Sequence, residues 1–193
     1  MEWIFQPLTQ KNLEKAAVLC DNCVGKNLYS PAYLASVLKK PEHCFRLLTN
    51  RDGEIAGYIY FFLARLEDMA ELSKFPVERL AAVFGRRKPV IGNLQSVGVD
   101  ERWRGRGLSR LLVSYYLNYI QFYWSADVAF GVFWKPGKTV PMEKTLKRLS
   151  FRYLGDARHV WYDREDLVCP YCRGRCRCDA AVYYRPLGKE EQV

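Results

Sequence analysis

The run VGVDERWRGRGLSRLL, at Val97–Leu112, reads as a strand, a turn with two glycines and the start of a helix. Gly105 and Gly107 have no side chains, so backbone N–H groups there can approach a ligand closely. The free N–H groups of a first helical turn and the positive end of the helix dipole form a site for anions. Three arginines add charge that does not titrate near neutral pH: Arg104, Arg106 and Arg110. The turn therefore predicts a phosphate site and favours a diphosphate.

Two common phosphate-binding motifs do not match this turn. A Walker loop requires GxxxxGK followed by Ser or Thr, and the sequence has no such run. A dinucleotide fingerprint requires a third glycine at position 110, where the chain has Arg110. That fingerprint also normally follows the first strand of its unit, whereas this turn lies halfway along the chain.

Helical and strand patterns alternate around the turn. We expect helices over residues 10–24, 31–40, 77–84, 107–122 and 140–149, and strands over residues 44–49, 54–65, 91–99, 126–134, 151–163 and 181–187. Within the strand 91–99, alternation places Val97 and Val99 on one face and Leu94 on the other. Residues 66–90 give only the short helix that follows Pro76. This order predicts an α/β fold in which helices pack on one mixed sheet.

The turn resembles the signature of the GCN5-related N-acetyltransferase (GNAT) family: Arg or Gln, two residues, Gly, one residue, then Gly or Ala. Arg104, Gly107 and Ser109 stand at those positions, and Ser109 departs from the pattern while staying small. The two N-terminal helices, the Asp52-Gly53 hairpin and the run TLKRLSF at 145–151 also follow the family's order. The resemblance implies one domain over 1–193. Its mixed, mostly antiparallel sheet would be flanked by helices and splayed between the fourth and fifth strands, those ending at Val99 and Trp134.

The resemblance also implies a donor and a reaction. Acetyl-CoA would lie in the splay, with its pantetheine arm along the strand and its pyrophosphate on the turn. The residues expected to bind it are Val97, Gly98, Val99, Arg104, Gly105, Arg106, Gly107, Leu108, Ser109 and Arg110. A neutral amine of unidentified acceptor would attack the thioester directly, which makes the chain an acetyl-CoA-dependent N-acyltransferase.

The resemblance does not assign the catalytic residues. Many family members carry a Tyr on the helix before a Gly-Phe pair, where this chain has Leu146 and then Ser150. Many also carry a Glu on the strand before the motif, where this chain has Asn93, Gln95 and Ser96; none of these three is a base at neutral pH. Gln95 is the candidate for orienting a water, and a polar residue satisfied by its neighbours is the alternative reading. A backbone N–H near Val97 would stabilise the oxyanion.

Four of the seven cysteines lie within ten residues: Cys169, Cys172, Cys176 and Cys178. Two short pairs of thiols suit tetrahedral Zn²⁺, and free or disulfide-forming cysteines or an iron–sulfur cluster are the alternatives. By the family comparison this cysteine-rich knuckle, 169–178, is inserted between the last two strands, beside the acceptor site, where a metal would be structural. An odd cysteine count and a start without a secretion signal argue against a disulfide framework.

The chain has 30 Lys and Arg against 21 Asp and Glu, a formal net charge of +9. Such an excess favours polyanionic partners. The alternative function is therefore a catalytically weak or inactive GNAT-fold protein that acts as a zinc-knuckle nucleic-acid-binding or adaptor module. No apolar run reaches the roughly 18 residues of a membrane helix. We expect a cytoplasmic monomer or homodimer that does not bind membranes.

Overall fold

Seven strands form one mixed sheet in the order β1-β2-β3-β4-β5-β7-β6 in the computed structural model, which describes residues 2–86 and 88–188. The strands are β1 (Ile4–Pro7), β2 (His43–Thr49), β3 (Ile55–Ala64), β4 (Ile91–Val99), β5 (Val128–Lys135), β6 (Arg152–Ala157) and β7 (Asp179–Pro186). The helices are α1 (Leu13–Val24), α2 (Pro31–Val37), α3 (Leu66–Ser73), α4 (Val77–Phe84), α5 (Leu108–Phe122) and α6 (Glu143–Arg148). No helix in the described ranges is long and apolar enough to cross a membrane.

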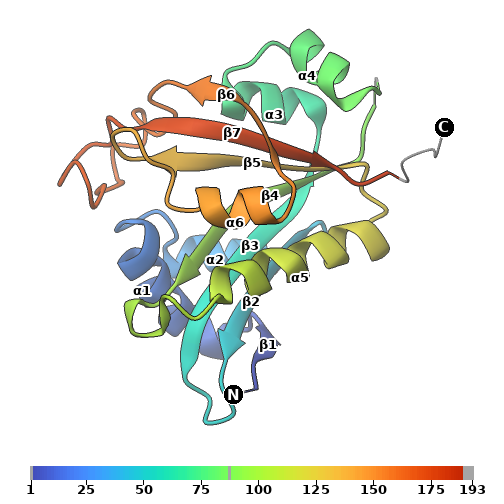
Figure 1. Ribbon diagram of the computed structural model, residues 1–193. Helices are drawn as coiled ribbons and strands as arrows, with labels where there is room; N and C mark the ends of the chain where they lie inside the picture. Colours follow the sequence, from blue (N-terminus) through green and yellow to red (C-terminus); the bar gives the residue numbers. More distant parts are fainter. Residues whose placement is uncertain (1, 87, 189–193) are drawn as a thin grey trace.

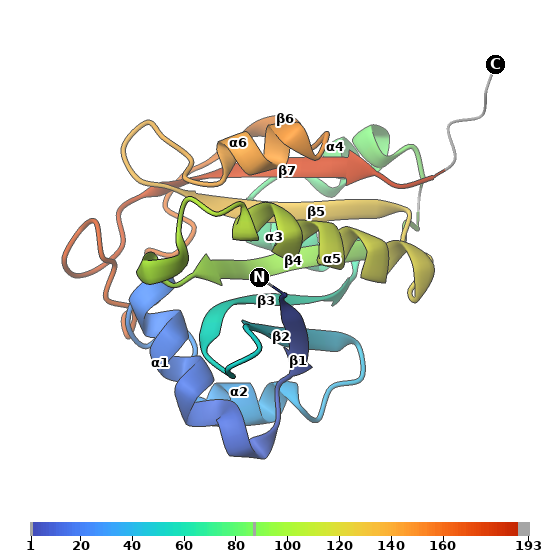
Figure 2. The same cartoon turned by 60° about the horizontal axis from the view of Figure 1, so that its bottom comes forward.

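Helices cover both faces of the sheet, as Figures 1 and 2 show. Alternation along β3 separates the two faces, because Ile59 and Phe61 pack with α5 and α6 whereas Tyr58 and Tyr60 pack with α1 and α2. Helices α3 and α4 lie on the same face as α1 and α2, over β5 and β7. The α/β fold predicted from the sequence, a mixed sheet flanked by helices, is therefore confirmed, with helices on both faces.

The sheet opens between β4 and β5. These two strands are parallel and share three residue pairs, the last being Asn93 with Phe130. The other neighbouring strands in the sheet are antiparallel. Strand β3 pairs with β4 from one end of β4 to the other, from Ala64 with Ile91 to Gly57 with Val99. The edge of β4 that faces β5 therefore has no strand partner beyond Asn93. The predicted splay between the fourth and fifth strands is confirmed.

Strand β4 contains an irregularity that the sequence analysis missed. Along β3, Tyr60 pairs with Ser96 and the next residue pairs with Leu94, so Gln95 is an extra residue on β4. A bulge shifts the phase of side-chain alternation by one residue. Leu94 consequently packs in the same core as Val97 and Val99, on the α5 face, and the prediction that it lies on the opposite face is wrong.

Two elements were not predicted and several ends differ. Strand β1 pairs with β2 at the edge of the sheet, and α3 precedes the short helix expected after Pro76. Strand β6 ends at Ala157 rather than at residue 163, and α2 ends at Val37 rather than at residue 40. The start of α2 agrees with the prediction, because the backbone N–H of Tyr33 donates to Ser30 Oγ at 3.2 Å.

Candidate functional site

A cleft of about 600 Å³ begins where the pairing of β4 with β5 ends. Its walls come from both faces of the sheet. On the α5 face they include Leu94, Val97 and the turn before α5, and on the other face they include Tyr29, Trp161 and the loop that leads into β7. The cleft thus passes through the sheet and connects the glycine turn with the cysteine-rich segment.

The glycine turn has the backbone that the sequence predicts. Gly105 and Gly107 both have left-handed backbones, with φ of +77° and +78°, and a Cβ at either position would meet open space. Gly107 is the N-cap of α5 and has no side chain with which to cap it, so the first N–H groups of the helix are free to bind a ligand. Glycine is therefore required here for its conformation and for the space it leaves in the cleft.

The arginines of the turn have different roles. Arg104 lines the cleft and its Nε donates to the carbonyl of Val99 at 3.1 Å, which holds the side chain beside β4. The Arg106 guanidinium lies 4.9 Å from the centre of the Trp103 ring, and Arg110 is exposed on the first turn of α5. Ser109 Oγ lies 2.9 Å from Thr145 Oγ1, so this hydroxyl joins α5 to α6.

A polar group lies on β4 at the bulge. Asn93 is fully buried, and its Nδ2 donates to Gln95 Oε1 at 3.0 Å. On the next residue, Ser96 Oγ lies 2.8 Å from Tyr58 Oη. Tyr29 reaches the same group from the loop after α1, and burial raises the pKa of its phenol although Ser96 lowers it. The Gln95 side chain thus lies between Asn93, which donates to its amide oxygen, and Tyr29, whose pKa it lowers.

Two buried side-chain atoms have no hydrogen-bond partner among the described residues: Asn93 Oδ1 and Trp103 Nε1. Both residues line the cleft, Asn93 where the pairing of β4 with β5 ends and Trp103 just before the glycine turn. Buried polar atoms are nearly always paired, and an unpaired one calls for a water, an ion or a ligand. One of these atoms is an acceptor and the other is a donor, so both point to a polar ligand that extends along β4.

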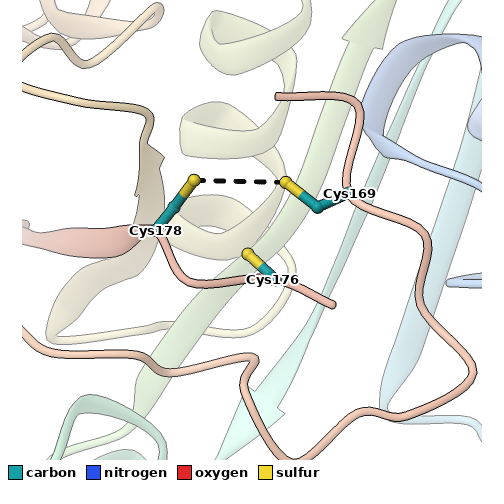
Figure 3. A group of neighbouring side chains, drawn as sticks. All are labelled: Cys169, Cys176 and Cys178. Carbon is teal, nitrogen blue, oxygen red and sulfur yellow. Dashed lines mark hydrogen bonds between the residues drawn. The ribbon is translucent and has the colours of Figure 1, made fainter. Parts of the chain in front are cut away.

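The cysteine-rich segment also borders the cleft. Cys169 and Cys176 line it, and Sγ of Cys169 lies 4.0 Å from Sγ of Cys178 (Figure 3). Burial raises the pKa of Cys169, but N–H groups of the following turn outweigh that effect and hold it below its usual value. Burial raises the pKa of Cys176 to about 11.

Comparisons with known proteins agree with this geometry. The model of the acetyltransferase (GNAT) family matches residues 13–123, which is more than half of the chain. The chain belongs to the GNAT family. A search of curated protein sequences finds no match.

Solved structures of GNAT acetyltransferases share the fold. NAA60 of Arabidopsis thaliana in complex with acetyl-CoA gives a TM-score of 0.72 at 12% identity, over 96% of this chain and 99% of that one. The ribosomal-protein-S18-alanine N-acetyltransferase of Escherichia coli gives 0.64 at 13% identity, over 100% and 99%. A mutant of spermidine N-acetyltransferase SpeG from Vibrio cholerae gives 0.63 at 10% identity, over 98% and 96%. At these identities the likeness shows the fold alone.

Within this GNAT fold, eight of the ten residues predicted to bind the cofactor line the cleft. Arg106 and Arg110 are the exceptions. Leu108 is buried in the core beneath α5, so only its backbone can serve a ligand. The structure also assigns Gly98 a packing role, because a Cβ there would lie 2.4 Å from the ring of Tyr58 and 2.7 Å from Cβ of Cys23.

The residues on the far side of the cleft were missed by the sequence analysis. They are mostly apolar or aromatic: Cys23, Val24, Leu28, Tyr29, Leu72, Val132, Trp134, Trp161 and Leu167. They come from segments scattered along the whole chain and carry no shared motif.

Proposed function

We propose that the chain transfers an acetyl group from acetyl-CoA to an amine in the cleft between β4 and β5. The observation that carries this proposal is the pair of unpartnered buried atoms, Asn93 Oδ1 and Trp103 Nε1, on the wall of a cleft that starts at the glycine turn. A ligand that fits has phosphates at one end, which bind the glycine turn, and amides along its length, which form hydrogen bonds with these two atoms. Acetyl-CoA has that chemistry.

The donor is held mainly by backbone. Its pyrophosphate binds the free N–H groups at the start of α5, where the helix dipole is positive, and Arg104 adds a fixed charge. The amides of the pantetheine arm pair with the free edge of β4 near Val97, Gly98 and Val99, in place of the missing strand. Positions that interact through the backbone tolerate variation of the side chain, which fits Ser109 at the end of the motif.

The reaction proceeds by direct attack. The amine nitrogen adds to the thioester carbon, the C–S bond then breaks, and the thiolate of CoA leaves and takes a proton from water. A backbone N–H near Val97 stabilises the oxyanion. The unpartnered Oδ1 of Asn93 and the amide of Gln95, two residues further along β4, orient the water that takes the ammonium proton. Neither group ionises near neutral pH, so the amine must reach the cleft in its neutral form.

The acceptor is an amine attached to an apolar or aromatic group. Arg104 is the one charged residue among those that line the described cleft, and the far side consists largely of aromatic and aliphatic side chains. A polyamine requires carboxylates to balance its remaining charges, and the cleft lining contains none. The rings of Tyr29, Trp134 and Trp161 instead suit a flat apolar group.

The test measures donor and acceptor separately. Acetyl-CoA at about 100 times its Kd should stabilise the fold by about 2.7 kcal/mol, a rise in Tm of roughly 5–10 °C. Release of free CoA thiol is then followed with tryptamine, tyramine and spermidine, and we expect the arylalkylamines to exceed spermidine. Absence of saturable CoA binding would overturn the proposal. Salt-sensitive binding of an oligonucleotide without CoA binding would support the nucleic-acid alternative instead.

A further inference from the structure

The sulfur atoms of the segment 169–178 converge although they come from two different arms of a loop. Sγ atoms of Cys169, Cys176 and Cys178 all lie within 4.8 Å of one another, and Figure 3 shows their side chains turned toward a common centre. Cys172 lies outside this group of three but its Sγ is 3.6 Å from Sγ of Cys178. The Cys169–Cys178 separation is 4.0 Å. Four sulfurs at about 2.3 Å from one tetrahedral zinc are about 3.8 Å apart, so both separations fit a shared ion.

The backbone of the first arm is folded into a tight turn around its cysteines. The N–H of Cys169 donates to the carbonyl of Gly174, and the N–H of Arg173 donates back to the carbonyl of Cys169, both at 2.8 Å. Arg173 has a left-handed backbone at φ +57°, which reverses the chain. This turn brings Cys172 back toward the second arm, where Cys176 and Cys178 lead into β7.

One backbone N–H group points at this group of sulfurs. The N–H of Arg177 donates to Sγ of Cys172 at 3.4 Å. A donor aimed at sulfur stabilises the negative charge of a thiolate, and such a bond orients the sulfur that binds a metal.

The cysteines lie in apolar surroundings. Leu167 and three of the cysteines form a buried cluster that packs against Leu28, Trp134 and Trp161. The described ligand atoms of the cluster are all sulfur, which selects a soft metal over calcium or magnesium. Four thiolates around Zn²⁺ leave two negative charges, and Arg173, Arg175 and Arg177 lie beside them.

We propose that Cys169, Cys172, Cys176 and Cys178 bind one zinc ion, which fixes the wall that closes the far end of the cleft. On binding, the thiols lose their protons to solvent and four Zn–S bonds form, with no change of oxidation state. The ion joins the two arms of the loop, and the loop contacts the end of α1 through the N–H of Val168, which donates to the carbonyl of Lys26 at 3.2 Å. The metal assignment does not depend on the proposed acetyl transfer.

The test uses the full chain purified without added chelator. Elemental analysis should find about one zinc per chain, and replacement by cobalt should give the visible absorption of a tetrahedral thiolate site. Cys172→Ser changes the least buried ligand, and it should weaken zinc binding roughly a hundredfold or more against a competing chelator. Cys23→Ser is the matched control, because Cys23 also belongs to a CxxC pair, is similarly half-buried and lies in the same cleft. It should retain the full metal content.

Three results would overturn the proposal. The first is protein without stoichiometric metal that also fails to bind cobalt. The second is a thiol count that shows a disulfide within 169–178 in the native protein. The third is unchanged zinc affinity in Cys172→Ser, which would refute the four-sulfur site. Affinity for CoA is measured in parallel, and it should change less than twofold in Cys172→Ser. A wild-type protein that binds zinc but not CoA would count against the proposed function and not against the metal site.

Discussion

Replacement of Gly107 by Val tests two reasons for a glycine at the N-cap of α5. One is the left-handed backbone, which affects the stability of the fold, and the other is the room left for a ligand, which affects binding. The native φ of +78° is strained for a β-branched residue by about 2 kcal/mol, so Tm should fall by roughly 4–8 °C and the chain should still fold. Cβ itself meets no atom within 4 Å and Gly107 lines the cleft, so we expect the added methyl groups to extend into it. There they displace the phosphates of CoA from the first N–H groups of the helix.

The loss of binding follows from the bonds displaced. A hydrogen bond to a charged group contributes about 1.5–3 kcal/mol, and two such bonds amount to about 3–6 kcal/mol. Each 1.4 kcal/mol is a factor of ten, so affinity for CoA should fall by at least about a hundredfold in calorimetry. Gly53→Val is the matched control, because Gly53 has a φ of +80° and equally open surroundings in the β2–β3 turn. It should lose similar stability and keep its affinity. Wild-type affinity in a folded Gly107→Val protein would refute the assignment of the phosphates to this turn.

Other predictions test the neighbouring groups. Arg104→Ala should weaken CoA binding only about tenfold, because the backbone N–H groups remain, and a loss as large as that of Gly107→Val would contradict the backbone model. Gln95→Leu should lower kcat roughly tenfold or more with unchanged affinity for acetyl-CoA, which single-turnover kinetics and calorimetry can check; an unchanged kcat would mean that Gln95 is only a satisfied polar residue. Gly98→Ala should destabilise the fold by about 1–3 kcal/mol in denaturant titrations, because its Cβ meets Tyr58 and Cys23, and a wild-type midpoint would show that α1 yields at this contact.

The sequence was sufficient for elements whose signals are local. The strand before the glycine turn, the helix after it and the Ser30-Pro31 start of α2 depend on residues close together in the chain, and all were predicted. Strand β1 was missed because four residues with mostly exposed side chains carry little alternation. Helix α3 was missed although its buried positions, Leu66, Met69, Ala70 and Ser73, have helical spacing, because it is only eight residues long and no side chain caps its start.

The same contrast between local and distant signals applies to the two sides of the candidate site. The donor side is one continuous motif, so its residues could be named in advance. The bulge at Gln95 could not be predicted, because it is defined by pairing with Tyr60 on another strand. The far side depends on contacts between distant segments, such as the packing of Leu28 and Trp134 against the buried cluster that contains Leu167. Neither the spacing nor the type of these residues distinguishes them from an ordinary core.

The break in pairing between β4 and β5 also separates the two walls of the cleft along the chain. One wall is β4 and the turn before α5, a single run of the sequence, whereas the other combines residues near α1, such as Tyr29, with β5 and the loop that leads into β7. A substitution on the second wall therefore need not disturb the glycine turn. We expect changes there to alter the choice of acceptor while the backbone that would hold the donor stays the same.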